Sequence, residues 1–380
     1  MPNPSRVADG SLAPRPFYRV GRLSLVGALF VSACFRPDFD HPTCGPAGEC
    51  PPGLFCGAQL ICSGVTDAQS SDMSPTTPVP KQSCIDLPTT CGPNGSDSCC
   101  NSPDVVGGVY HRSYDVAGDA NSGTPAYLAT VSTFRLDKYE VTVGRFRAFV
   151  NAKMGTQASS PIPGTGQHRN LPGSGWELAW NANLAADTTA LLVAVKCYPS
   201  LQTWTDMPGD NEGRPMNCIS WYEAMAFCTW DGGYLPTEAE WNYAATGGEQ
   251  QRAYPWSSVA APLELDTSRA SYFDATCSGD GMPGCTVADL LRVGSKPAGD
   301  GRWGQSDLAG NVFEWTLDSF AGYVSPCTDC ADLTVAPNRV ARGGSFADDA
   351  TYLRTADRRY QYPAASRNVV LGVRCARSAP

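Results

Sequence analysis

Two stretches in the C-terminal third of the sequence carry residues whose types and spacing could do chemistry. In the first, Asp307 and Glu314 supply carboxylate oxygens on either side of Gly310, a residue that permits a tight turn. Hard oxygen ligands from acids and from backbone carbonyls are what calcium binds in proteins. The residue types alone favour the simpler alternative, a turn whose acids are solvated.

The second stretch places Ser345 shortly before Asp348 and Asp349. A hydroxyl beside two carboxylates could form an acid/base or hard-metal pocket, although a solvated acidic loop is the favoured interpretation. The only histidines are His41, His111 and His168, and the sequence has no G-x-S-x-G, P-loop or H-E-x-x-H motif. No other recognised catalytic motif is therefore available.

Composition indicates the class of protein and its compartment. The formal net charge is −9, which argues against a nucleic-acid partner. Seventeen cysteines in 380 residues indicate an oxidising compartment, and therefore export.

The N-terminus supports export. Arginines precede an apolar run over residues 23–31, which is too short to span a bilayer, so residues 1–33 are predicted to be a signal peptide. Val31-Ser32-Ala33-Cys34 resembles the lipobox of bacterial lipoproteins, which predicts lipidation of Cys34 and a membrane partner through that anchor. Sixteen cysteines would then remain, an even number that can pair. Phe35, rather than Asp, resembles the signal for export to the outer membrane where the cell has one.

The chain divides into three parts after the signal peptide. Residues 34–65 carry four cysteines spaced six apart and predict a small disulfide-stapled knob, with a zinc site as the competing interpretation. Residues 66–103 predict a Ser/Thr/Pro linker followed by a cysteine-rich loop. Residues 104–380 predict the folded domain.

Within this domain, strands are expected at 126–131 and 134–139, and residues 155–210 are expected to form loops. Cys197 and Cys218 flank one loop and are natural partners, although spacing alone does not assign the pair.

Three helix starts are predicted from their capping residues. Thr142 is expected to cap a short helix, and Ser220 with Glu223 is expected to form a capping box. A second capping box joins Thr237 to Glu240, in a segment that ends at a left-handed stop near Gly247. These local signals predict a well-capped surface helix.

Four blocks of the domain, considered together, resemble the formylglycine-generating enzyme family, also called the sulfatase-modifying factor family. They are F-R-L-D-K-Y-E-V-T-V-G-R-F-R-A-F-V at 134–150, R-P-M-N-C-I-S-W-Y-E-A-M-A-F-C-T-W-D-G-G-Y-L-P-T-E-A-E-W-N-Y-A-A-T-G-G at 214–248, D-L-A-G-N-V-F-E-W-T at 307–316, and R-G-G-S-F with G-V-R-C-A near the C-terminus. The resemblance implies an α+β, loop-rich, C-type-lectin-like fold.

The resemblance also implies particular structural sites. It pairs Cys228 with Cys375 in a disulfide, whereas a second family disulfide has lost both cysteines, to Ala245 and Arg358. It favours calcium at the first stretch, held by the side chains of Asp307 and Glu314 and the carbonyls of Gly310 and Val312. A second family calcium site would fall at Ser271 and Tyr272, where serine replaces the usual asparagine.

The family's oxidation chemistry uses copper held by two cysteines after the Gly-Gly-Ser motif. Those positions are Asp348 and Leu353 here, so the pocket beside Ser345 has no thiolate pair. Cu(I) requires such soft ligands. We therefore expect that copper is absent and that the known route of formylglycine formation does not operate.

Two functional hypotheses follow. The first is an exported lipoprotein whose domain is a binding or assembly module for an exported protein or peptide, with the pocket near Ser345 as its recognition surface. The second is a non-copper oxidative or maturation enzyme of the same family, acting on an exported peptide or siderophore-like substrate.

Overall fold

The computed structural model describes residues 55–56, 62–63, 81–116, 125–258 and 264–380, in two units that divide between Pro75 and Thr76. In the first unit, β1 (Phe55–Cys56) pairs antiparallel with β2 (Cys62–Ser63), with Cys56 opposite Cys62. The predicted signal peptide, Cys34, His41 and most of the knob and linker lie outside the described residues. No helix in the described ranges is long and apolar enough to cross a membrane.

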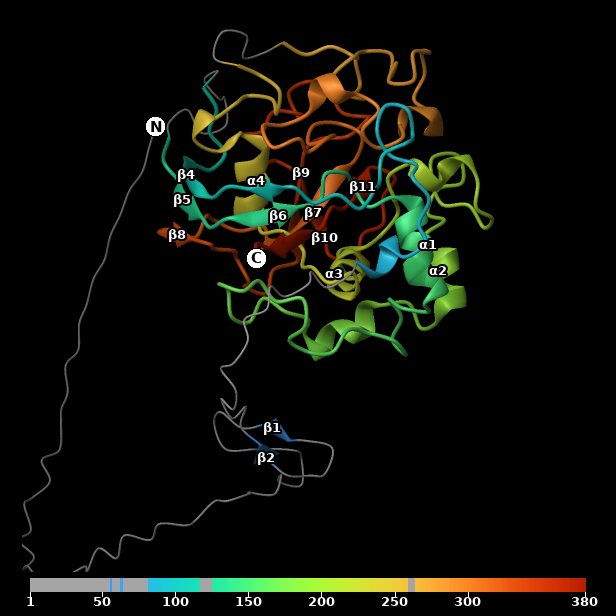
Figure 1. Ribbon diagram of the computed structural model, residues 1–380, viewed down its shortest axis with the longest axis vertical. Helices are drawn as coiled ribbons and strands as arrows, with labels where there is room; N and C mark the ends of the chain where they lie inside the picture. The colour runs from blue at the N-terminus through green and yellow to red at the C-terminus, as the bar shows by residue number, and fades with distance from the viewer. Residues whose placement is uncertain (1–54, 57–61, 64–80, 117–124, 259–263) are drawn as a thin grey trace, which may run out of the picture. The chain divides into compact units, whose positions relative to one another are not determined.

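The second unit is a mixed α+β structure of short elements set among long loops (Figure 1). Its α-helices are α1 (Val143–Asn151), α2 (Thr188–Ala194), α3 (Trp221–Trp230) and α4 (Glu238–Ala245). Its strands are β3 (Asp104–Val105), β4 (Gly108–His111), β5 (Leu128–Val131), β6 (Phe134–Leu136), β7 (Phe313–Ser319), β8 (Cys327–Thr328), β9 (Asn338–Arg342), β10 (Gln361–Pro363), β11 (Leu371–Gly372) and β12 (Ala376–Ser378). The 3-10 helices of the described residues are η1 (Gln82–Cys84), η2 (Leu178–Asn183), η3 (Asp210–Gly213), η4 (Gly248–Gln250), η5 (Val287–Asp289) and η6 (Pro297–Gly299).

Within the described ranges, the strands of this unit form three small sheets, whose orders are β10-β9-β7-β11, β12-β6-β3 and β4-β5-β8. β7 is antiparallel to β9, with Glu314 opposite Arg342, and parallel to β11. β12 is antiparallel to β6, with Ala376 opposite Leu136. Strands far apart in sequence therefore join early residues of the domain to its C-terminal end.

The helix starts form as their capping residues predict. Thr142 accepts a hydrogen bond from the Arg145 amide, and both capping boxes, Ser220 with Glu223 and Thr237 with Glu240, are complete. The prediction of a surface helix after Thr237 was wrong, because every residue of α4 is buried. Local caps fix where a helix begins, whereas its burial depends on distant strands that the caps do not specify.

Two other expectations change in detail. Residues 155–210 are mostly loop but include α2, which Asp187 caps by accepting from the Ala190 amide at 2.8 Å. Thr188 and Thr189 are weak helix formers, which hides this helix in the sequence. The second predicted strand is shorter than expected and ends at Leu136, and the next side chain, Asp137, is ion-paired with Arg145 in the interior.

The main hydrophobic core lies around α3 and β7. The indole of Trp221 donates to the Thr316 carbonyl at 2.8 Å, and that of Trp315 donates to the Ile219 carbonyl at 3.1 Å. Both tryptophans are fully buried. Cys228, on α3, is bonded to Cys375, which directly precedes β12, so a disulfide crosses the core.

Candidate functional site

A glycine turn at the end of β9 shapes the region around Ser345. Gly343 and Gly344 have φ angles of 102° and 74°, a left-handed backbone that favours glycine. A Cβ atom at Gly344 would lie 2.7 Å from the Leu353 Cδ1 atom. The turn therefore brings Ser345 close to Leu353. We call these two residues, together with Asp348, Tyr360 and Tyr362, the Ser345 site.

Asp348 is the central polar group of the Ser345 site. Its carboxylate accepts hydrogen bonds from the hydroxyl of Ser345 and, at 2.9 Å, from the phenol of Tyr360. Burial raises the pKa of Asp348, and these hydrogen bonds oppose the rise. The neighbouring Asp349 instead accepts from the Thr351 amide at 2.9 Å in a local turn. The two acids therefore have different hydrogen-bond partners, although the charge of Asp349 also raises the pKa of Asp348.

Leu353 supplies no ligand atom to this site. Its side chain is fully buried against Tyr254, Ala270 and Ala309. Together with the carboxylate at Asp348, it gives the site one hard oxygen donor and one hydrocarbon where the family motif carries two sulfurs. The structure therefore has no soft ligand at these positions.

Every cysteine from residue 81 to the C-terminus belongs to a disulfide. The pairs are Cys84–Cys100, Cys91–Cys99, Cys197–Cys218, Cys228–Cys375, Cys277–Cys285 and Cys327–Cys330. The third and fourth are the pairs expected from the sequence. The folded domain thus has no free thiolate to offer a metal.

Half-buried aromatic rings flank the Ser345 site. Tyr360 lies 5.0 Å from Tyr352, 5.9 Å from Tyr362 and 4.4 Å from Phe313, between ring centroids. Arg359 lies over the ring of Tyr352 at 4.1 Å. Phenol rings with an apolar face and a polar end are typical of binding surfaces.

The predicted calcium segment forms a turn that is closed by hydrogen bonds. The Asp307 carboxylate accepts from the Gly294 amide at 2.6 Å, and the Gly310 amide donates to the Gly343 carbonyl at 3.0 Å. Gly310 has a φ of 86°, and a Cβ atom there would collide with the carbonyl of Ser271. Burial raises the pKa of Asp307 to about 6.

Glu314, the other predicted acidic ligand, is committed to protein partners. Arg374 donates to both of its carboxylate oxygens at 2.6 Å, and the Trp241 indole donates to one at 2.7 Å. All three side chains are buried. An amide of this turn also contacts the second predicted calcium site, because the Asn311 amide donates to the Ser271 carbonyl at 2.9 Å.

Glu140 is a buried acid of this region that the sequence reasoning missed. It accepts from the Asn311 side chain at 2.6 Å and from the Val312 amide at 3.2 Å. Burial, together with the charges of Asp307 and Glu314, raises its pKa well above the usual range. The only signal in the sequence was its position in the E-V-T block.

The negative charge of this region would favour a bound cation. The positions of the possible ligand atoms match a metal site only in part. The charge of Arg374 acts on Glu140 and Asp307 and pairs with Glu314, and Lys296 is a second cation near Asp307, so three acids face two bases. Within the described ranges, no three such side chains converge on one metal position. Asp307 and the carbonyls of Gly310 and Val312 could still hold calcium, which would offset the excess negative charge. Calcium binding therefore stays a prediction.

The positions of the missing family disulfide are bridged by a different interaction. Arg358 donates to Glu238, the first residue of α4, at 2.7 Å and stacks over Tyr323 at 4.3 Å. Ala245 is fully buried in the core at the other end of α4. An ion pair thus connects α4 to the segment around Arg358, which the family disulfide would otherwise connect.

The two histidines in the described residues lie outside the Ser345 site. His168 is buried, and its Nε2 lies 3.2 Å from the Glu240 carboxylate in the second capping box. His111 lies on β4. Neither contacts Asp348.

Comparison with known proteins places the chain in a family. Residues 99–379 match the sulfatase-modifying factor enzyme 1-like domain. The chain therefore belongs to this family, as the four sequence blocks indicated.

Several curated relatives match about two thirds of the chain. The formylglycine-generating enzyme of Thermomonospora curvata is 30% identical over 280 residues, 66% of this chain and 84% of that protein. The inactive C-alpha-formylglycine-generating enzyme 2 of Bos taurus is 27% identical, over 67% of this chain and 79% of that protein. The hercynine oxygenase of Mycolicibacterium thermoresistibile is 28% identical, over 66% of this chain and 52% of that protein. The family thus includes oxidases and a member designated inactive.

Among solved structures, that of PvdO from Pseudomonas aeruginosa superposes with a TM-score of 0.52 at 19% identity, covering 77% of this chain and 99% of that chain. This similarity supports the fold alone. The α+β, loop-rich fold expected from the sequence is confirmed.

Proposed function

We propose that this chain is an exported, lipid-anchored binding or assembly module, in which the Ser345 site recognises an exported protein or peptide and performs no copper chemistry. The observation that carries the proposal is the pair of residues at the copper positions. Asp348 is held by Ser345 and Tyr360, and Leu353 is packed in the interior.

Two further observations support a binding role. All cysteines of the domain are in disulfides, so no thiolate elsewhere substitutes for the missing pair. The site keeps an ordered scaffold, with the left-handed Gly343-Gly344 turn on one side and the contacting rings of Tyr352, Tyr360 and Tyr362 on the other. Similarity to a family member designated inactive agrees with a fold kept for recognition.

The first test measures copper and oxidation together. The purified chain is titrated with Cu(I) against a chromogenic chelator, and incubated in air with a sulfatase-derived cysteine peptide. We expect no stoichiometric copper and no aldehyde product. A variant carrying both Asp348→Cys and Leu353→Cys serves as the matched control and is expected to bind Cu(I) at least tenfold more tightly. Stoichiometric copper in the unaltered chain would contradict the proposal.

The second test maps the binding surface in the producing cell. A photo-crosslinking amino acid is placed at Asp349, which is exposed beside the site, and at Val193, which is exposed on α2. We expect a discrete crosslinked partner from the Asp349 variant and none from the Val193 variant. The same pattern from both positions would rule out recognition at the Ser345 site.

The third test concerns the anchor. Cys34→Ser is expected to release the protein from the membrane fraction and abolish labelling by a fatty-acid analogue. Retention of both in the variant would refute lipidation at Cys34.

An alternative function is a non-copper maturation or oxidation enzyme acting on an exported peptide or siderophore-like substrate. Similarity to a hercynine oxygenase and the half-buried acid at Asp348 favour it. Stoichiometric iron, found together with turnover that Asp348→Asn abolishes, would select this alternative.

A further inference from the structure

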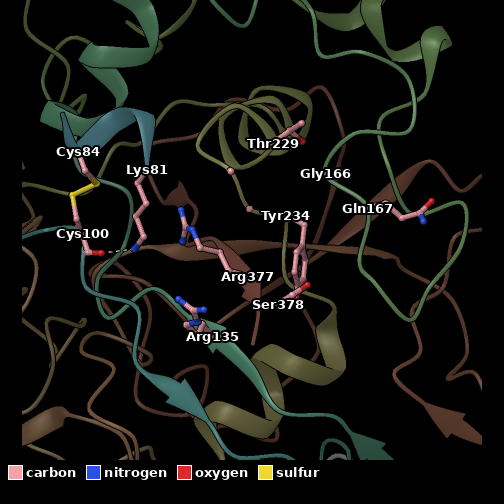
Figure 2. Close-up of a pocket in the computed structure, with 12 residues that line it drawn as sticks. Lys81, Cys84, Cys100, Arg135, Gly166, Gln167, Thr229, Tyr234, Arg377 and Ser378 are labelled. Carbon is pink, nitrogen blue, oxygen red and sulfur yellow. Dashed lines mark hydrogen bonds between the residues drawn. A yellow bond between two sulfur atoms is a disulfide. The ribbon is translucent and has the colours of Figure 1, made fainter. Parts of the chain in front are cut away.

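A cavity of about 620 Å³ lies away from the Ser345 site. The side chains around it come from residues 81–100 of the second unit, from β6, from the end of α3 and from β12 (Figure 2). Its described lining residues are Lys81, Cys84, Cys100, Arg135, Gly166, Gln167, Thr229, Gly232, Gly233, Tyr234, Arg377 and Ser378. The Cys84–Cys100 disulfide forms part of its wall and holds the segment that carries Lys81.

The lining of this cavity is positively charged. Lys81, Arg135 and Arg377 come from three different parts of the chain, and no described lining residue is an acid. Figure 2 shows the three side chains around one space. A cavity with cations on several sides concentrates anions.

The acids behind the cavity do not balance its bases. Asp137 and Asp231 are fully buried and are shared among three cations. Arg145 contacts them at 2.8 and 2.6 Å, Arg377 pairs with both, and Lys81 lies 3.2 Å from Asp137. Three positive charges thus face two negative ones. Arg135 adds a fourth cation, whose own partner, Asp104, lies 3.6 Å away with a mostly exposed side chain.

Some donors at the cavity have no acceptor. Arg377 is 8% exposed, and although its terminal nitrogens are paired, its Nε has no hydrogen-bond partner among the described residues. The hydroxyl of Thr229 also makes no hydrogen bond there, and the Nε of Arg135 has only the ion pair with Asp104 at 3.6 Å. These three atoms are themselves buried, so an anion in the cavity would be held by the positive charge of the lining and not by these donors.

We propose that this cavity binds a small organic polyanion, a di- or tricarboxylate or a phosphate ester, through Lys81, Arg135 and Arg377. Guanidinium groups match the oxygens of carboxylates and phosphates in a two-point geometry. The volume exceeds the need of a single inorganic ion and admits a small organic molecule. Because no residue of the Ser345 site lines the cavity, this proposal stands or fails independently of the proposed function.

The site has a built-in pH dependence. Lys81 faces Asp137, Arg377 and Arg145, and burial with the two arginines lowers its pKa to about 8 although Asp137 opposes this. A bound anion favours the charged lysine, so binding is accompanied by proton uptake. Affinity should therefore fall by up to about tenfold between pH 7 and pH 9.

The test titrates the full chain, with its disulfides intact, with citrate and with pyrophosphate by calorimetry at pH 7 and pH 9. We expect saturable binding of one anion per chain by at least one of these probes, weaker at pH 9. Arg135→Gln should weaken binding about tenfold, and Arg135→Glu should weaken it further. Arg135 is chosen because its own ion pair is exposed, whereas Arg377→Gln would leave Asp137 and Asp231 under-paired and could unfold the chain.

Arg269→Gln is the matched control. Its side chain is 22% exposed, against 23% for Arg135, it forms surface ion pairs, and its Nε also lacks a hydrogen bond, but it does not line the cavity. This variant should bind like the unaltered chain, and thermal melting without anion verifies that all variants are folded. Absence of saturable binding of both probes at 10 mM, or equal binding by the folded Arg135→Glu variant, would overturn the proposal.

Discussion

Arg374 and Glu314 form a two-point ion pair in the interior, with both nitrogen–oxygen distances at 2.6 Å and side-chain exposures of 0% and 1%. Arg374 lies next to Cys375, and Glu314 lies on β7. The pair therefore connects the disulfide that crosses the core to the turn predicted to bind calcium.

Removing the arginine should destabilise the fold strongly. Arg374→Met leaves Glu314 buried beside Glu140 and Asp307 without its counter-charge, and breaking a buried pair in this way typically costs about 3–5 kcal/mol. Arg302→Met, which removes an exposed pair with Glu249, should cost less than about 1 kcal/mol. Urea unfolding measures the free energy of unfolding of both variants. Similar losses in the two variants would show that the buried pair contributes no more stability than the exposed one.

Calcium should raise the melting temperature of the chain by several degrees, and chelation should reverse this effect. The expected ligands are Asp307 and the carbonyls of Gly310 and Val312, so Asp307→Ala should abolish the response. Magnesium should not replace calcium, since it requires a smaller and more regular coordination shell. An unchanged melting temperature in 10 mM calcium would count against the site.

The Cys228–Cys375 disulfide should matter more than a short-range one. Replacing both cysteines by serine opens a loop with a sequence separation of 147 residues, which the chain-entropy model values at about 5 kcal/mol. The same change at Cys277–Cys285, with a separation of 8 residues, should cost about 2–3 kcal/mol. Denaturant titration of the two double variants measures the difference, and secreted yield should follow the same order.

Asp318 should make stability fall as the pH rises. Burial and the charge of Glu238 raise its pKa to about 7. Between about pH 4, the value of an unfolded aspartate, and pH 7, the folded state keeps a proton that the unfolded state has lost. Stability therefore declines by about 1.4 kcal/mol per pH unit in this window and levels off above it.

Asp318→Asn removes this titration. The substitution also changes the hydrogen bonds from the Glu238 and Asp332 amides to the carboxylate, which can shift the free energy of unfolding equally at every pH. The free energy of unfolding is compared between pH 5 and pH 7 for both chains, so that other groups cancel. A slope that is the same in the variant and in the unaltered chain would contradict the assignment.

The features predicted correctly from the sequence are mainly local ones. The capping boxes at Ser220 and Thr237 depend on residues three positions apart, which a single sequence displays. The fold followed from the order of four motif blocks, because each block contains unusual residue types.

Features that join distant residues were not predictable in the same way. The contacts of Arg358 with Glu238 and of Glu140 with Val312 span 120 and 172 residues. No periodicity or spacing encodes such contacts, and the charged cavity likewise assembles from β6, β12 and residues 81–100. The sequence identified Glu314 as a candidate ligand but gave no sign that Arg374 would hold it.

The disulfide pattern has a practical consequence for intact and cleaved forms of this protein. The Cys228–Cys375 bond encloses two others, Cys277–Cys285 and Cys327–Cys330. A protease that nicks the chain once anywhere between Cys228 and Cys375 therefore releases no fragment, and the two pieces separate only after reduction. A gel run without reductant would report such a nicked molecule as whole.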